Sequence, residues 1–248
     1  MSSQIPGMPM PLPPTDPGQG AHGSQPWYSR ADDYAFAETV TVAIGVADGL
    51  GWTHAAAHLR HYLENTGKDL TLDPDQIMNE DPTLKQKADK VVNDYVRYLA
   101  GDPANYGKTI PFQVPWEADH SFSKSSQPDW YYAIGSVHVT ASGVAEIHSP
   151  DTEGAQPRVT VDFQIHLFDR YNWDSETADS KGKGVTIGSI AIDDRRMGAL
   201  HTAGLAKEFN MLGSSVVKRY DGVIANGSVD STGPESVRDT RVDPTRTF

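Results

Sequence analysis

The pattern of apolar and polar residues predicts four helices in the N-terminal part of the chain. Their segments are 35–51, 53–67, 73–78 and 81–101. The first is apolar along most of its length, which is typical of a buried helix. The last carries an apolar stripe at helical spacing, formed by Leu84, Ala88, Val91, Tyr95 and Leu99. Thr53, Asp73 and Asp81 stand where side chains cap helix N-termini.

The period changes to that of β-strands after residue 128. Residues 158–168 alternate strictly, and their apolar face consists of Val159, Val161, Phe163, Ile165 and Leu167. Thr160, Asp162, Gln164 and His166 form the polar face. Further strands are expected over 129–142, 143–149 and 185–192, with Gly143 in the turn between the first two.

A helix is expected near residues 194–212, capped by Asp193 or Asp194 and ended by Gly213. The order of elements indicates an α+β fold. We therefore expect an N-terminal helical subdomain, an antiparallel sheet of about four strands, and a C-terminal helix packed on that sheet. The expected segments are a disordered Pro-rich leader (1–27), the helical subdomain (28–101), the sheet with its helix (102–221) and a flexible tail (222–248).

The leader holds seven of the 17 prolines and neither Lys nor Arg. Such a segment buries too little apolar surface to offset the entropy of ordering. It also lacks the basic and apolar stretches of a Sec-type secretory signal. Two roles are considered: a linker or solubility tail, and a docking segment for a delivery apparatus. In the second case the protein is made in the cytoplasm and is exported or packaged by a dedicated system.

The net charge of −12 and the absence of Cys narrow the possible functions. Acidity disfavours nucleic acids and anionic membranes, because both attract clustered Lys and Arg. A chain without Cys has no disulfide, no thiolate nucleophile and no Cys-ligated zinc. No apolar run has the length of a transmembrane helix. No cofactor fingerprint is present, so a small-molecule enzyme of the cytoplasm ranks third among the function classes.

Candidate chemistry gathers where the long strand ends, in the stretch FDRYNWD at residues 168–174. A sheet fixes the backbone there while side chains reach into a cleft. Asp169 and Asp174 could act as a general base or bind a hard cation such as Mg²⁺. Tyr171 could donate a proton or orient a phosphate, and Arg170 could stabilise negative charge.

Two histidines are candidates for the acid in this chemistry. His166 lies on the polar face of the same strand, and His201 lies on the final predicted helix. The alternative interpretation is structural. Aromatic residues at a strand end plug the sheet, Asp and Asn cap turns, and Arg pairs with a neighbouring Asp.

Weaker motifs occur elsewhere. His54, His58 and His61 share one helix face, where they either chelate a metal or border the apolar stripe. The S-x-x-K pattern at 121–124 lacks its companion motifs. Residues 180–185 are interpreted as a hairpin turn. Asn226 begins a glycosylation sequon in the expected tail.

The stretch FDRYNWD resembles the D-x-Y-D core of colicin M-type bacteriocins. Asp169 and Tyr171 match its first two positions, and Asn172 stands where that family has its second Asp. The family's downstream His-Arg is replaced by Ala178 and Asp179. The resemblance implies divalent-cation-dependent hydrolysis of a phosphate ester in a peptidoglycan precursor. The middle and C-terminal parts also resemble effector domains of bacterial polymorphic toxins.

These observations favour a delivered antibacterial effector, a hydrolase of a phosphate ester or a cell-envelope precursor. Its expected catalytic residues are Asp169, Arg170, Tyr171, Asn172, Asp174, His166 and His201, with Asp169 and Asp174 as ligands of a possible Mg²⁺. The expected partners are a delivery apparatus and an immunity protein. The alternative is a non-enzymatic structural or binding component of a secreted particle or phage-like assembly, in which the leader and tail serve as docking arms.

Overall fold

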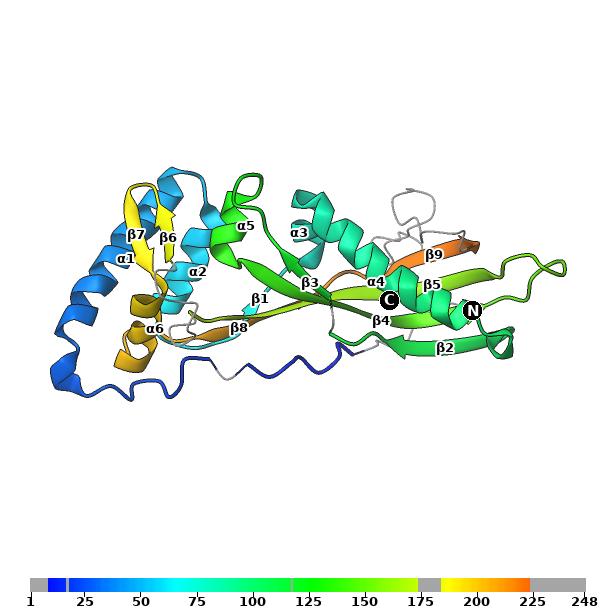
Figure 1. Cartoon of the computed structure of the whole chain (residues 1–248), viewed down its shortest axis with the longest axis horizontal. Helices are drawn as coiled ribbons and strands as arrows, with labels where there is room; N and C mark the ends of the chain where they lie inside the picture. The colour runs from blue at the N-terminus through cyan, green and yellow to red at the C-terminus, as the bar shows by residue number, and fades with distance from the viewer. Residues whose placement is uncertain (1–8, 17, 117, 174–183, 224–248) are drawn as a thin grey trace, which may run out of the picture.

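Figure 1 shows the chain as a computed structural model that describes residues 9–16, 18–116, 118–173 and 184–223. Its helices are η1 (Trp27–Ser29), α1 (Ala31–Gly49), α2 (Thr53–Leu63), α3 (Pro74–Glu80), α4 (Pro82–Ala100), η2 (Pro103–Asn105), α5 (Pro128–Ala133) and α6 (Asp194–Ala203). Its strands are β1 (Leu70–Thr71), β2 (Lys108–Gln113), β3 (Ala118–Ser121), β4 (Ser136–Ile147), β5 (Arg158–Tyr171), β6 (Gly184–Ile187), β7 (Ile190–Asp193), β8 (Phe209–Ser214) and β9 (Lys218–Val223).

The α+β class is confirmed, but the main sheet has seven strands rather than about four. Its order is β1-β8-β5-β4-β2, with β3 paired to β4 and β9 paired to β5. The pairing is antiparallel except between β1 and β8, which are parallel. Strand β5 meets β9 along residues 158–163 and β8 along 166–171. The short edge strands were missed because two to six residues are too few to establish a period.

The predicted alternation of β5 is confirmed. All five residues of its apolar face are at most 1% exposed. Helix α4 packs on β4 and β5, while α1, α2, α5 and α6 gather at one end of the sheet (Figure 1). The core therefore extends along the sheet and into this group of helices.

Three of the four predicted helix caps are confirmed, and the carboxylate of Asp193 caps α6 by accepting from Arg196 N (2.9 Å). The carboxylate of Asp73 accepts from backbone N–H groups at the start of α3, and that of Asp81 does the same for α4. Thr53 is instead the first residue of α2 and does not cap it. The carboxylate of Asp129, on α5, accepts from His54 N (3.1 Å) and Ala55 N (2.8 Å). This contact fixes α5 against the start of α2.

The helix predicted over 194–212 is wrong in its second half. Helix α6 ends at Ala203, because Gly204 adopts a left-handed conformation with φ 73°. The chain then forms β8, in which Gly213 allows the close approach of β1. A Cβ on Gly213 would lie 2.0 Å from the carbonyl oxygen of Leu72. The apolar residues of this second half fit both the helical and the strand period, and they were assigned to a helix.

Three strand predictions also need correction. Residues 128–133 form helix α5, because Pro128 starts a helical turn there. Gly143 lies inside the continuous strand β4, where a Cβ would come 2.4 Å from the carbonyl oxygen of Asp162. The segment 185–192 is the hairpin of β6 and β7, which turns at Gly188 with φ 61°.

The described part of the leader runs along the body of the protein, where the sequence predicts disorder (Figure 1). Gly23 N donates to His201 O (3.1 Å), and Gln25 N donates to Thr202 O (2.8 Å). Backbone hydrogen bonds hold residues 23–25, and Pro11 is buried near the start of the described segment. At the other end of the chain, β9 extends to Val223, and residues 224–248 lie outside the described residues, as do Asn226 and residues 180–183.

Within the described residues, no helix combines the length and apolar character that crossing a membrane requires.

Candidate functional site

Strand alternation divides the predicted cluster between the two faces of the sheet. The ring of Tyr171 stacks on Phe209 of β8, with centroids 4.9 Å apart, on the helix-covered side. Asp169 lies two residues earlier on the same strand and therefore shares this side. Arg170 points to the opposite side, where its guanidinium contacts Glu208. Neighbouring residues of FDRYNW thus reach different surroundings.

A cleft of about 430 Å³ lies beside the end of β5. The pairing of β4 with β5 ends at His138 and Phe168, while β5 continues to Tyr171. The strands part there, and α5 with the turn before β4 provides the opposite wall. The walls include five aromatic residues and two carboxylates, namely Phe122, Tyr131, Tyr132, Tyr171, Trp173, Asp169 and Asp194. The volume and aromatic lining are those of small-molecule sites.

The wall formed by α5 is held in place from two directions. Tyr132 donates its hydroxyl hydrogen to Thr186 O on β6 (2.9 Å). Its ring stacks on Trp52, with centroids 4.7 Å apart. Together with the Asp129 cap of α2, these contacts fix the distance between α5 and the rest of the protein. The α5 wall of the cleft is therefore fixed by its contacts with the rest of the protein.

Two buried polar groups on the β5 side of the cleft have no hydrogen-bond partner among the described residues. They are the Tyr171 hydroxyl and the Trp173 indole nitrogen. Burial raises the pKa of Tyr171 above its ordinary value of 10, so the hydroxyl keeps its proton. The nearby Trp173 opposes this shift, yet its geometry falls short of a hydrogen bond. Unsatisfied buried polar groups of this kind are rare in folded proteins.

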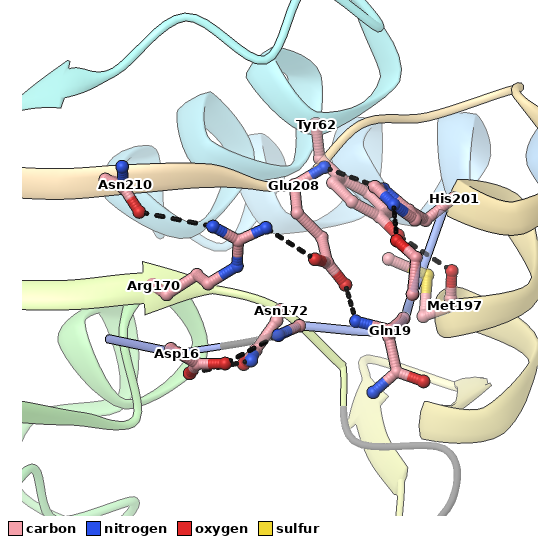
Figure 2. Close-up of polar contacts among 11 residues, drawn as sticks. Asp16, Gln19, Tyr62, Arg170, Asn172, Met197, His201, Glu208 and Asn210 are labelled. Carbon is pink, nitrogen blue, oxygen red and sulfur yellow. Dashed lines mark hydrogen bonds and ion pairs between the residues drawn. The ribbon is translucent and has the colours of Figure 1, made fainter. Parts of the chain in front are cut away.

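A second polar group lies on the opposite face of the sheet (Figure 2). The Arg170 guanidinium donates to Glu208 Oε2 (3.0 Å) and to Asn210 Oδ1 (3.4 Å). The Glu208 side chain is 0% exposed, so Arg170 is the charge that compensates a fully buried carboxylate. Arg170 is thus engaged by Glu208, which limits its capacity to bind a phosphate in the cleft.

His201 joins this second group from α6. Glu208 N donates to its Nδ1 (3.2 Å), so Nε2 carries the hydrogen and donates to Gly20 O (3.1 Å). Burial lowers the pKa of His201, although the neighbouring Glu208 carboxylate opposes the shift. The imidazole is therefore a neutral link between the body and the leader.

The leader covers the second group. Gln19 N donates to Glu208 Oε1 (3.0 Å), and Asn172 Nδ2 donates to Asp16 Oδ2 (3.0 Å) (Figure 2). The side chain of Asn172 is thereby directed to the leader, although the residue also lines the cleft.

His166 lies apart from both groups, in the middle of the sheet. Its two ring nitrogens are each 2.7 Å from a serine hydroxyl oxygen, of Ser142 on β4 and Ser214 on β8. Burial lowers its pKa from 6.5 to about 4. This cross-strand row satisfies the imidazole but does not bring it to the cleft.

The predicted site residues therefore converge only in part. Asp169, Arg170, Tyr171 and Asn172 line the cleft, while His166 and His201 do not. Asp174, the second carboxylate of the proposed Mg²⁺ site, lies outside the described residues. Within residues 9–16, 18–116, 118–173 and 184–223, no group of three or more His, Asp or Glu side chains is arranged to hold a metal.

The three histidines of α2 have separate partners. The ring of His54 stacks on Trp130, with centroids 3.8 Å apart. His58 Nδ1 donates to the carbonyl of residue 133 (2.8 Å), and burial lowers the pKa of His58 to about 4. His61 Nε2 donates to the carbonyl of residue 68 (2.7 Å). These contacts agree with the alternative in which the histidines border the apolar stripe.

Sequence reasoning missed two contributors to these groups. Asp194 was considered only as a helix cap, yet it also lines the cleft. Glu208 was placed on the final helix, whereas it precedes β8 and lies beneath the leader. Gly204 inside the predicted helix was the sequence signal available for the second error, because glycine commonly ends a helix. No protein-family model, curated protein or solved structure matches this chain.

Proposed function

We propose that the chain is a binding protein and that the cleft at the end of β5 accepts a small hydroxylated ligand, about the size of a mono- or disaccharide. The observation that carries the proposal is the aromatic-walled cleft of about 430 Å³ with two carboxylates on its walls, behind which lie two buried polar groups without partners among the described residues, the Tyr171 hydroxyl and the Trp173 indole nitrogen. A sugar that enters the cleft and shifts the Trp173 side chain would bring acceptors to these two groups, which solvent does not reach in the unliganded protein. Its hydroxyls also donate to carboxylates such as Asp169 and Asp194.

Replacing Tyr171 with Phe tests this function. The variant keeps the ring that stacks on Phe209 and removes only the unpartnered hydroxyl. Affinity is expected to fall by about tenfold, because one hydrogen bond to the ligand is lost. Calorimetric titration with N-acetylglucosamine and its β-1,4-linked disaccharide gives the measurement.

The same variant is expected to keep or increase its thermal stability, since a buried hydroxyl without a partner costs free energy in the unliganded protein. Tyr98→Phe is the matched control, because Tyr98 is 75% exposed and does not line the cleft. The proposal would be contradicted if neither sugar bound the wild type. It would also be contradicted if Tyr171→Phe and the wild type bound the sugars equally.

The effector hydrolase remains a second candidate, favoured by one observation. Asp169 and Asp194 line the same cleft, and two carboxylates beside a bound ligand can serve as general acid and base. A cell-envelope precursor combines sugar rings with a phosphate ester, so a sugar-binding cleft is compatible with this substrate class. Any Mg²⁺ would be held by Asp169 together with Asp174, as the sequence predicts.

This candidate predicts toxicity that depends on a cleft carboxylate. Export of the wild type to the periplasm of a bacterial host is expected to reduce viable counts by at least about tenfold, and Asp169→Asn is expected to abolish the loss. The control is Asp151→Asn, at an exposed position in the loop between β4 and β5. Equal survival of cells exporting wild type and Asp169→Asn, with both proteins folded by circular dichroism, would eliminate the hydrolase and leave the binding function.

A further inference from the structure

The leader occupies its place on the body as a bound peptide would. Residues 18–23 form turns, and three glycines there adopt positive φ, namely Gly18 (62°), Gly20 (95°) and Gly23 (70°). The segment crosses the Arg170–Glu208 pair and then the C-terminal end of α6 (Figure 2). The surface beneath it is polar and is built from β5, β8 and α6.

The body contacts this segment mainly through the leader's backbone. Gln19 N donates to the Glu208 carboxylate, and Gly20 O accepts from His201 Nε2. Further along, Gly23 N and Gln25 N donate to two carbonyls at the end of α6. Backbone contacts of this kind recognise the path of a peptide rather than its side chains.

Two features of the surface make it prefer particular residues in the peptide that it binds. Asn172 Nδ2 donates to the Asp16 carboxylate (3.0 Å). At Gly18 there is no space for a side chain, because a Cβ would lie 2.0 Å from Glu208 Oε2 and 2.9 Å from Arg170 Nε. Glu208 cannot swing aside cheaply, since its carboxylate is fully buried and bonded to Arg170. The surface therefore favours an Asp two residues before a glycine.

The leader's attachment is nevertheless shallow. Among the described residues from 12 to 25, none is buried. Pro11 is buried, but residues 12–16 and 18–25 are held by hydrogen bonds without a buried apolar side chain, and such a segment opens at low free-energy cost. Opening would expose the buried Glu208 carboxylate and the Nε of Arg170, which has no partner among the described residues. The groove thus requires an occupant, but its resident occupant is replaceable.

We propose that Asn172, Arg170, Glu208 and His201 form a binding site for a glycine-rich peptide turn of the pattern Asp-x-Gly-x-Gly supplied by a partner protein, and that the chain's own residues 16–25 fill this site in its absence. The site lies on the face of the sheet opposite the Tyr171 side of the cleft. Arg170 and Asn172 also line the cleft, but their side-chain hydrogen bonds go to Glu208, Asn210 and Asp16, so the peptide site uses contacts that the sugar-binding function does not.

The test uses the whole chain with the substitution Gly18→Ala, whose own leader cannot bind to the site. The probe is a fluorescent synthetic peptide with the sequence of residues 9–26. Fluorescence anisotropy is expected to show binding to Gly18→Ala about tenfold or more tighter than to wild type, whose site is already filled. The same peptide with Ala in place of Gly18 is expected to bind neither protein measurably.

Two controls keep the outcome decisive. Gly20→Ala carries similar positive-φ strain but meets no atom within 4 Å, so its leader is expected to stay in place more than that of Gly18→Ala. Hydrogen exchange of residues 18–25 shows whether the leader has been released. A released leader without peptide binding, or a leader still protected in Gly18→Ala, would overturn the proposal.

Discussion

Replacing Arg170 with Ala is expected to lower the free energy of unfolding by about 3–5 kcal/mol, because it strands a buried carboxylate. Glu208 is 0% exposed, and its Oε2 is 3.0 Å from the Arg170 guanidinium. The remaining donor described for this carboxylate, the backbone N–H of Gln19, is uncharged and lies on the leader. Urea denaturation measures this change in the free energy of unfolding, with the same slope against urea concentration (m) applied to both proteins.

The double variant Arg170→Ala/Glu208→Gln separates charge from packing. Removing the charge of Glu208 together with that of Arg170 is expected to recover part of the loss. Arg158→Ala is the matched control, since Arg158 forms a bidentate pair with Asp221 on the exposed surface. A loss for Arg170→Ala no larger than that for Arg158→Ala would show that the buried pair does not stabilise the fold.

Acid is expected to destabilise the protein through two buried histidines. Burial lowers the pKa of His58 and of His166 from 6.5 to about 4. The unfolded chain takes up these protons near pH 6.5, whereas the folded chain does so only near pH 4. The unfolded state therefore binds more protons in this window, and stability falls as the pH drops from 6.5 to 4. The loss amounts to roughly 3 kcal/mol per histidine.

The contribution of His166 can be isolated by substitution. His166→Gln is expected to be less stable than wild type at pH 7, because the contacts with Ser142 and Ser214 are altered. Its stability should depend less steeply on pH between 6.5 and 4. Gln164→Ala, on the same face of β5, introduces no titrating group and is expected to keep the wild-type slope. Parallel slopes for all three proteins would contradict the role of His166.

Local patterns predicted those parts of the fold that depend on near neighbours. The alternation of β5 follows from one buried face, and the Asp73 and Asp81 caps follow from bonds to N–H groups two or three residues later. Helix α6 was extended too far because apolar residues at 205, 209 and 212 fit a helical period. The decisive factors were the left-handed Gly204 and the approach of Leu72 to Gly213, and the second is a tertiary contact.

The candidate site was predictable in position but not in arrangement. The end of β5 was identified because polar and aromatic residues gather there, and five of them, residues 169–173, line the cleft. Which face each side chain joins depends on the pairing of Tyr171 with Phe209 and of Arg170 with Asn210. The partners Asp194 and Glu208 come from other elements, and a single sequence carries no signal that joins them to β5.

The closure of the leader on Glu208 also orders events during synthesis of the protein. Gln19 leaves the ribosome early, but its partner Glu208 is 189 residues later in the chain. At ordinary translation rates this interval is about 10–40 s. Throughout that time the leader cannot form its contact with Glu208, so its polar groups stay exposed to solvent while the nascent chain is still growing.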